Sequence, residues 1–209
     1  MLQQMGAHNV VPPLRTRILD AAIEVVAESG WSGVTMIAVG ERAGVSRQSV
    51  YNEIGSKPQL GQELIAREVA MFLSKVSEAI ERESSPNAAI VAAASSVFTI
   101  ARDNVLLSAA LSPGLDAETE LLPLLTTEST PIIQGASDVV VNSLSRNYSD
   151  VLPDEETLYA AVVLVVRLVL SYVIRPFGTP AQMAEQVGWV GSQLLAPVPV
   201  SSSDRGNLM

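Results

Sequence analysis

Residues 35–57 read TMIAVGERAGVSRQSVYNEIGSK, and this stretch decides the fold that we expect. Two short helical segments flank a glycine turn, and a third helix begins at the basic end of the stretch. Thr35 and Ser46 are favourable N-cap residues, and Gly44 suits a turn where a Cβ would clash. The pattern is typical of a helix-turn-helix, which lays its second helix in the DNA major groove.

Composition favours helices for the rest of the chain. Of the 209 residues, 48% are hydrophobic but 4% are aromatic, a mix that suits close-packed helices. Because no stretch has a strand pattern, we expect an all-α fold of about nine helices. Cysteine is absent, which excludes a disulfide framework and a thiolate metal site. The N-terminus lacks the form of a signal peptide, so a cytoplasmic location is expected.

Charge is divided unevenly along the chain. Residues 1–57 carry five basic and five acidic side chains, whereas residues 58–209 carry eight basic and 17 acidic ones. The net charge of −9 therefore belongs to the C-terminal part, which DNA would repel. The neutral N-terminal part can touch DNA if its cations lie at one end, and we expect it to need a paired second copy.

Helical periodicity and capping residues divide the rest of the chain. A first helix is predicted over about 14–29, because Gly30 follows its last apolar residue. A long fourth helix is predicted from Ser56 to the break at 84–87, and a continuous fifth helix over 87–111. A short helix at most is predicted over 118–125, and further helices over 130–148, 152–176 and 180–196.

These elements predict two domains. Residues 14–57 are expected to form a three-helix, helix-turn-helix DNA-binding domain at the N-terminus. Residues 58–196 are expected to form a C-terminal helical domain for ligand binding and dimerisation. Residues 1–13 and 197–209 are expected to be flexible tails, and the fourth helix would connect the two domains as a lever.

The N-terminal part resembles the TetR family of bacterial regulators from Arg17 to about Leu60. The residues that carry the resemblance are Ile18, Leu19, Ala21, Ala22, Glu28, Gly30, Trp31, Thr35, Ala43, Gly44, Val45, Ser46, Val50, Tyr51, Lys57 and Leu60. The first turn of the second helix of the motif points at base edges, and the resemblance implies phosphate contacts from Thr35, Tyr51 and Lys57. The candidate DNA-binding residues are Thr35, Ser46, Arg47, Gln48, Ser49, Tyr51, Asn52 and Lys57.

Two positions depart from the pattern of the family. Glu53 and Ile54 stand where the family usually has histidine and an aromatic residue. A carboxylate near phosphate is unfavourable, so Glu53 either points away from DNA or lowers affinity. Gly40 stands where the family usually has alanine; it costs about 1 kcal/mol of helix stability but could permit a closer approach.

Residues 158–174, LYAAVVLVVRLVLSYVI, are apolar nearly all round. A membrane span is the alternative, but this length is at the short limit for about 30 Å and Arg167 lies near the middle. We expect coverage on every side, partly by a second copy, and the resemblance implies a homodimer through the last two helices. Candidate seams are Leu158, Val162, Val165, Val169 and Tyr172, and Gln186, Val190, Gln193 and Leu194, with Gly188 and Gly191 allowing close approach.

The apolar interior predicts a long apolar ligand with one polar end, such as a fatty acid or an acyl thioester. Arg102 or Arg167 would hold a carboxylate, although Arg167 is as readily a structural ion-pair partner. Residues 49–60, SVYNEIGSKPQL, also resemble an actinobacterial TetR subgroup found beside lipid and alkane genes. The candidate ligand-binding residues are Phe98, Ala101, Arg102, Val105, Ile133, Gln134, Val163, Val166 and Arg167.

No catalytic constellation is visible, because the only histidine, His8, lies in a predicted tail. We expect neither an enzyme nor a cofactor or metal. The prediction is a regulator, acting as a repressor, that binds a near-palindromic operator on double-stranded DNA as a homodimer and is released by its ligand. The alternative is a lipid-binding protein without a transcriptional role, and a membrane anchor is the third reading.

Overall fold

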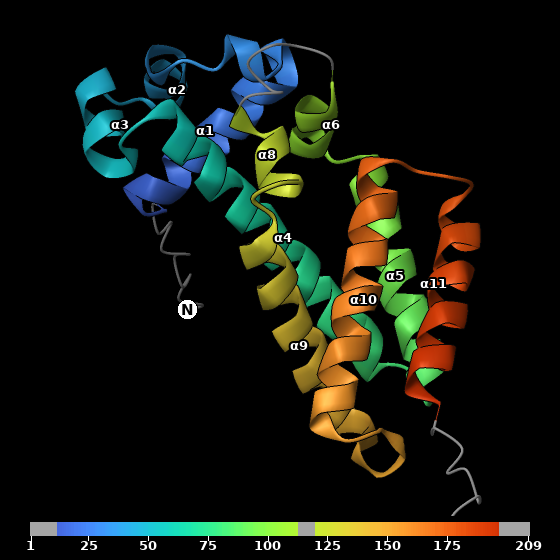
Figure 1. The fold of residues 1–209 in the computed structure, drawn as a ribbon. Coiled ribbons are helices and arrows are strands. Elements are labelled where there is room, and N and C mark those ends of the chain that lie inside the picture. Colours follow the sequence, from blue (N-terminus) through green and yellow to red (C-terminus); the bar gives the residue numbers. More distant parts are fainter. Residues whose placement is uncertain (1–11, 113–119, 197–209) are drawn as a thin grey trace, which may run out of the picture. The chain divides into compact units, whose positions relative to one another are not determined.

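The computed structural model describes residues 12–112 and 120–196. Within these ranges every regular element is a helix, as Figure 1 shows, and the all-α prediction is confirmed. The N-terminal elements are α1 (Leu14–Ser29), η1 (Trp31–Gly33), α2 (Met36–Ala43), α3 (Arg47–Ile54) and α4 (Lys57–Glu81). The later elements are α5 (Pro86–Arg102), α6 (Val105–Leu111), α8 (Leu122–Leu125), α9 (Thr130–Tyr148), η2 (Ser149–Val151), α10 (Glu155–Ile174) and α11 (Pro180–Leu195).

The chain divides into two compact units. The head unit contains described residues 12–68, 104–112 and 120–127, and the body unit contains residues 69–103 and 128–196. The division falls within α4, and a segment expected in the C-terminal domain groups with the helix-turn-helix. The predicted functional boundary between residues 57 and 58 stays a prediction. The predicted tails lie outside the described residues, apart from Pro12 and Pro13.

In the head unit α1 packs against α2, α3 and α6. The fully buried side chains of the head unit include Ile18 of α1, Trp31 of η1, Val50 of α3 and Leu60 of α4, and their burial stabilises its core. A Cβ on Gly40 would lie 2.9 Å from the carbonyl oxygen of Val45. The missing side chain therefore does permit a close approach, here of α2 to the turn before α3.

The predicted continuous helix over 87–111 is wrong, because the chain breaks at Asp103 and Asn104. The Asn104 side chain accepts a hydrogen bond from the Leu107 N–H at 2.8 Å and so begins α6. Its amide nitrogen also donates to Glu68 at 2.5 Å. Apolar periodicity continues through the break, so the pattern of the sequence did not reveal it.

In the body unit α5 packs on α10 and α11, and α10 also packs on α9, as Figure 1 shows. Two apolar clusters hold these helices together. One contains Val76, Ile80, Ala89, Leu144, Leu158 and Val162. The other contains Ile90, Ala94, Phe98, Met183, Ala184 and Val187.

Part of the predicted dimer seam is wrong, because Leu158 and Val162 are buried inside the chain itself. Gly188 and Gly191 are buried as well, and a Cβ at either position would overlap Val91 or Ile90 of α5. These glycines therefore allow α11 to approach α5 within one chain. The sequence could not show which neighbour the small residues face.

Helix α10 is long and apolar enough to span a membrane, with a mean hydropathy of 2.2 over its most apolar window. Core helices of globular proteins pass the same test of length and composition. Leu158 and Val162 of α10 are buried against other helices of the body unit, and Ala161 is buried as well. Across its most apolar window 28% of α10 is buried, so the described residues of one chain leave most of this helix uncovered.

Candidate DNA-binding surface

The helix-turn-helix is held by caps at the starts of both its helices. The Thr35 hydroxyl accepts from the Ala38 N–H at 3.1 Å, and the Ser46 hydroxyl accepts from the Ser49 N–H at 3.1 Å. Between them Gly44 has φ 69° and ψ 37°, the left-handed conformation that favours glycine. The predicted N-caps and turn are confirmed.

The exposed face of α3 is formed by Arg47, Gln48, Tyr51 and Asn52, while Val50 and Ile54 are buried. Gln48 Nε2 donates to Asn52 Oδ1 at 2.8 Å. The Arg47 guanidinium lies 5.2 Å from the centre of the Tyr51 ring and donates to its hydroxyl at 3.3 Å. These pairs, one helical turn apart, order four side chains whose amide and guanidinium groups suit base edges or phosphates.

Ser49 is placed differently from its neighbours on α3. Its side chain is half-buried, and its hydroxyl lies 2.9 Å from the Ser46 hydroxyl. Both serines therefore take part in the cap of α3. The other predicted DNA-binding residues of α3 are exposed together on one face.

Lys57, at the start of α4, is half-buried within the head unit. Its Nζ lies 3.7 Å from Glu120 Oε2 and 5.1 Å from the centre of the Trp31 ring. The Trp31 indole N–H donates to the same Glu120 oxygen at 2.6 Å. Sequence reasoning missed Glu120, because no local pattern connects it with a residue so far away along the chain.

The remaining cations of the helix-turn-helix region are bound within the head unit. Arg42 pairs with Glu24 at 2.9 Å and with Glu28 at 2.5 Å, and its hydrogen bond lowers the pKa of Glu28. Arg17 donates to the Ala43 carbonyl at 2.6 Å, at the end of α2, and Arg15 pairs with other carboxylates. These three arginines therefore connect elements within the head unit.

The predicted ligand-binding residues lie in different surroundings. Phe98 and Ile133 are buried, Ala101, Val163 and Val166 are half-buried, and Arg102, Val105, Gln134 and Arg167 are exposed. Phe98 packs edge-on against the Tyr172 ring at 5.9 Å, whereas Val166 packs against the other apolar cluster. Arg102 pairs with Asp103 at 3.4 Å on the surface. Their role in binding stays a prediction.

A capped, exposed second helix behind a left-handed glycine turn defines a helix-turn-helix protein. Comparison with known proteins gives the family within this class. The family of bacterial regulatory proteins called tetR matches residues 18–64, and the C-terminal domain of the bacterial tetracyclin repressor matches residues 86–193. This chain belongs to the TetR family of bacterial transcriptional regulators, which bind DNA and small-molecule ligands, typically as dimers.

Individual relatives agree with the family. The HTH-type transcriptional regulator AlkX of Mycobacterium tuberculosis is 31% identical over 165 residues, which cover 78% of this chain and 76% of that protein. The HTH-type transcriptional regulator UidR of Escherichia coli K12 is 35% identical over 69 residues, or 33% of this chain and 35% of that protein. The AlkX relative from Mycobacterium agrees with the resemblance to actinobacterial members of the family.

Solved structures support the fold. The TetR family repressor AlkX from Dietzia sp. strain DQ12-45-1b, implicated in biodegradation of n-alkanes, has a TM-score of 0.72 at 24% identity and covers 90% of this chain and 97% of its own. FadR from Bacillus subtilis in complex with stearoyl-CoA has a TM-score of 0.53 at 17% identity and covers 88% and 98%. At these identities the two structures bear on the fold alone.

Proposed function

We propose that this regulator is a cytoplasmic repressor that binds a near-palindromic operator as a homodimer and is released by a long apolar ligand. The observation that supports operator reading is the ordered, exposed face of α3. Two copies of α3 would enter successive major grooves about 34–36 Å apart. The membership in a family of transcriptional regulators favours this function over lipid binding without a transcriptional role.

The proposed DNA contacts divide into two kinds. Arg47, Gln48 and Asn52 read base edges, because guanidinium and amide groups can bond two atoms of one base. Thr35, Tyr51 and Lys57 contact phosphates and set the register. Ser46 and Ser49 act through the cap of α3, and their N–H groups lie at the helix start, where an anion is favoured.

Fluorescence anisotropy on duplexes enriched from a random pool by the full-length protein tests this division. Gln48→Ala should weaken binding to the enriched duplex and leave a shuffled duplex unaffected, whereas Tyr51→Phe and Lys57→Ala should weaken both. Gln62→Ala, an exposed glutamine on α4, is the matched control. Equal losses on both duplexes for all three variants would contradict the division, and no enriched duplex would contradict the repressor.

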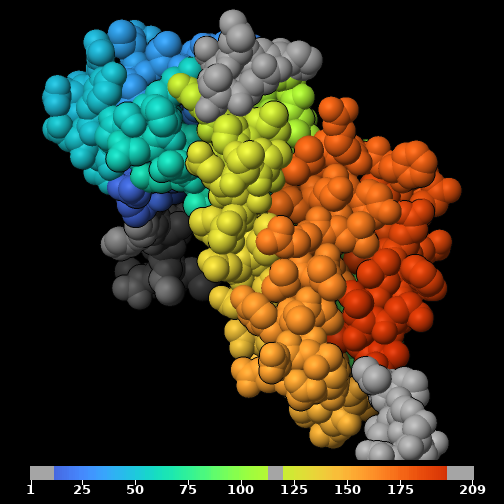
Figure 2. Space-filling model, viewed as in Figure 1, coloured from blue at the N-terminus to red at the C-terminus, as the bar shows by residue number. Residues whose placement is uncertain are grey.

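The homodimer is proposed to form through α10 and α11. Leu164 of α10 is 53% exposed and Trp189 of α11 is 67% exposed, on the helices drawn in orange and red in Figure 2. Large apolar side chains exposed on two neighbouring helices are candidates for a protein–protein interaction site. Sedimentation of the wild-type protein should give a dimer, and Trp189→Glu should give a monomer. Ser74→Glu, which changes an exposed residue of α4 in the body unit, is the control.

The ligand is proposed to lie among apolar residues of α5, α9 and α10. A related solved structure contains stearoyl-CoA, and another belongs to a repressor implicated in biodegradation of n-alkanes. The hydrocarbon chain would contact Phe98, Ala101, Ile133, Val163 and Val166 of the body unit. Arg102, Arg167 or Gln134 would take the polar end, after a rearrangement that turns the exposed group inward.

Native mass spectrometry and thermal shifts with long-chain acids and acyl thioesters test the ligand. Loss of the thermal shift in Arg102→Ala or Arg167→Ala would identify the anchor, and Arg82→Ala is an exposed control. Absence of both a co-purified lipid and a thermal shift would reject this ligand class.

Release of DNA would occur by a population shift. A ligand that binds more tightly to a conformation in which the two copies of α3 are not at operator spacing would raise the population of that conformation, and α4 would act as the lever.

A further inference from the structure

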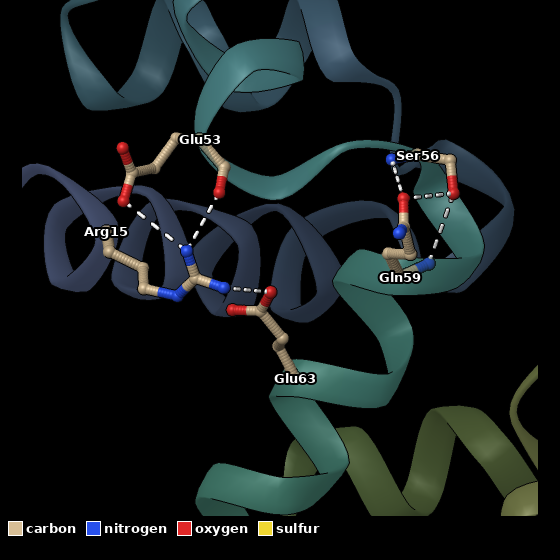
Figure 3. Close-up of polar contacts among 5 residues, drawn as sticks. All are labelled: Arg15, Glu53, Ser56, Gln59 and Glu63. Carbon is tan, nitrogen blue, oxygen red and sulfur yellow. Dashed lines mark hydrogen bonds and ion pairs between the residues drawn. The ribbon is translucent and has the colours of Figure 1, made fainter.

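Arg15 of α1 contacts the ends of two other helices, as Figure 3 shows. Its Nη1 donates to the carbonyl oxygen of Glu53 at 2.8 Å and lies 3.4 Å from the Glu53 carboxylate. Its Nη2 donates to the Glu63 carboxylate at 2.5 Å. One guanidinium therefore connects α1 with the last turn of α3 and the second turn of α4.

The carbonyl that Arg15 reaches belongs to the end of the recognition helix. The last carbonyls of a helix have no partner within it and carry the negative end of the helix dipole. A cation at this position therefore bonds to a group that would otherwise face water. The guanidinium also fixes the direction of the hydrogen bonds between α1 and the end of α3, because its donors are planar and rigid.

After α3 the chain passes through Gly55 to the start of α4, where a second set of hydrogen bonds holds it. The Ser56 N–H donates to Gln59 Oε1 at 2.8 Å, and the Gln59 N–H donates to the Ser56 hydroxyl at 3.4 Å, as Figure 3 also shows. This reciprocal cap holds the first turn of α4. Arg15, at the end of α3, and this cap, at the start of α4, together fix the connection between the two helices.

Glu53 lies on the side of α3 turned from the exposed face. With about 3.6 residues per turn, residue 53 is on the far side from the middle of the surface that Arg47, Gln48, Tyr51 and Asn52 form. Its side chain bends toward α1, where it meets Arg15. Of the two alternatives left open by the sequence, the structure supports a carboxylate that points away from DNA.

The contacts are too exposed to serve mainly as a source of stability. The side chain of Arg15 is 49% exposed and those of Glu53 and Glu63 are 34% and 25% exposed. Ion pairs at such exposure contribute little to folding because water screens them. Recognition of bases, in contrast, depends on the direction in which a helix presents its side chains.

We propose that Arg15 is a positioning residue for operator reading. The Glu53 and Glu63 carboxylates orient its guanidinium beneath the end of α3, and this contact fixes the angle at which Gln48 and Asn52 meet the bases. The inference rests on the proposed function of α3 as the recognition helix. It gives the acidic residue at position 53 a role that does not require contact with DNA.

The test measures the affinity of full-length variants for an enriched duplex and for a shuffled duplex of the same length. Arg15→Ala should reduce the ratio of the two affinities about tenfold, mostly by weakening the enriched duplex. Arg15→Lys should recover only part of the ratio, because one ammonium cannot bond to two carboxylates and a carbonyl in the same geometry. Thermal melts of every variant verify folding.

Arg67→Ala is the matched control, because Arg67 pairs with Asp20 at 2.7 Å and connects α4 with α1 without touching α3. It should shift the melting temperature about as much as Arg15→Ala and leave the affinity ratio unchanged. An equal effect of both variants on the ratio would overturn the proposal. So would an Arg15→Ala variant that weakens both duplexes equally, because the arginine would then act through its charge alone.

Glu53→Gln separates positioning from repulsion. Under the proposal it lowers the affinity ratio in the wild-type background and has no further effect in the Arg15→Ala background. A rise in affinity for both duplexes would mean that Glu53 repels DNA, and would overturn the proposal. A wild-type protein that binds both duplexes equally would overturn the proposed repressor function, and this inference with it.

Discussion

The head unit and the body unit are stabilised by different kinds of contact. In the head unit, side-chain caps begin α2 and α3, and arginines bond to the carbonyls near their ends. In the body unit, two apolar clusters and the contact of two glycines with α5 hold the helices together. Directional contacts need particular residues at particular positions, whereas apolar packing accepts many combinations of similar side chains.

This difference explains why the function of the head unit can be recognised from the sequence, whereas the function of the body unit cannot. The cap and turn residues of the helix-turn-helix are recognisable in the sequence because few residue types can replace them. The apolar residues of α5, α9 and α10 resemble those of any helical core. Four substitutions test this difference between the units.

The largest effect is expected for Phe98→Ala in the body unit. Phe98 is 3% exposed and packs on the Tyr172 ring, so its truncation should lower the free energy of unfolding by about 3–5 kcal/mol. Chemical denaturation measures the change. The matched control, Phe177→Ala, removes a ring that is 78% exposed and should have almost no effect. A cost below about 1 kcal/mol for Phe98→Ala would contradict a large contribution of this ring to the packing of the body unit.

The next effect is expected for Gly44→Ala in the head unit. A Cβ at this position meets only Arg17 Nη2, at an ordinary 3.7 Å, so the cost of about 1–2 kcal/mol should come from the left-handed backbone. Gly135→Ala, in the open interior of α9, should instead stabilise the protein by about 0.5–1 kcal/mol. Thermal denaturation of both variants checks the opposite signs, and equal signs would remove this distinction between the two units.

A smaller effect is expected for Ser137→Ala on α9. Its hydroxyl is buried without a hydrogen-bond partner among the described residues. Replacement by alanine should raise the free energy of unfolding by about 1 kcal/mol, because no bond is lost and the buried polar group disappears. Ser143→Ala is the control, since its hydroxyl lies 3.2 Å from that of Ser77 and its loss should destabilise the protein. A destabilised Ser137→Ala variant would mean that the hydroxyl has a partner after all.

The smallest effect concerns pH and Asp154, the N-cap of α10. Hydrogen bonds from the backbone N–H and the hydroxyl of Thr157 lower the pKa of Asp154 below its ordinary value. Because the folded-state pKa is lowered, this stabilisation is present near neutral pH and is lost as pH falls through the folded-state value. Asp154→Asn should therefore make the melting temperature fall less steeply than wild type between about pH 5 and about pH 3. Identical pH curves would contradict a role for the ionised cap.

The sequence predicted the elements that end in caps and turns. The helices over 14–29 and 130–148 were placed correctly because Gly30 and the proline after Thr130 mark their boundaries, and Ser46 caps α3 as predicted. The predicted fifth helix was wrong at Asn104, since an asparagine cap inside an apolar periodic run is not distinctive. The sequence also did not predict long-range contacts, such as the pairing of Arg15 with Glu63 and of Lys57 with Glu120.

Local signals within a few residues of each other were sufficient to predict the family, the all-α class and the helix-turn-helix. The partner of each charged or small residue, in contrast, became visible only in the folded chain. Arg15 and Arg42 bond to carboxylates of the head unit, and Gly188 faces α5 within the same chain. Such choices depend on side chains brought together by folding, and no spacing along the chain records them.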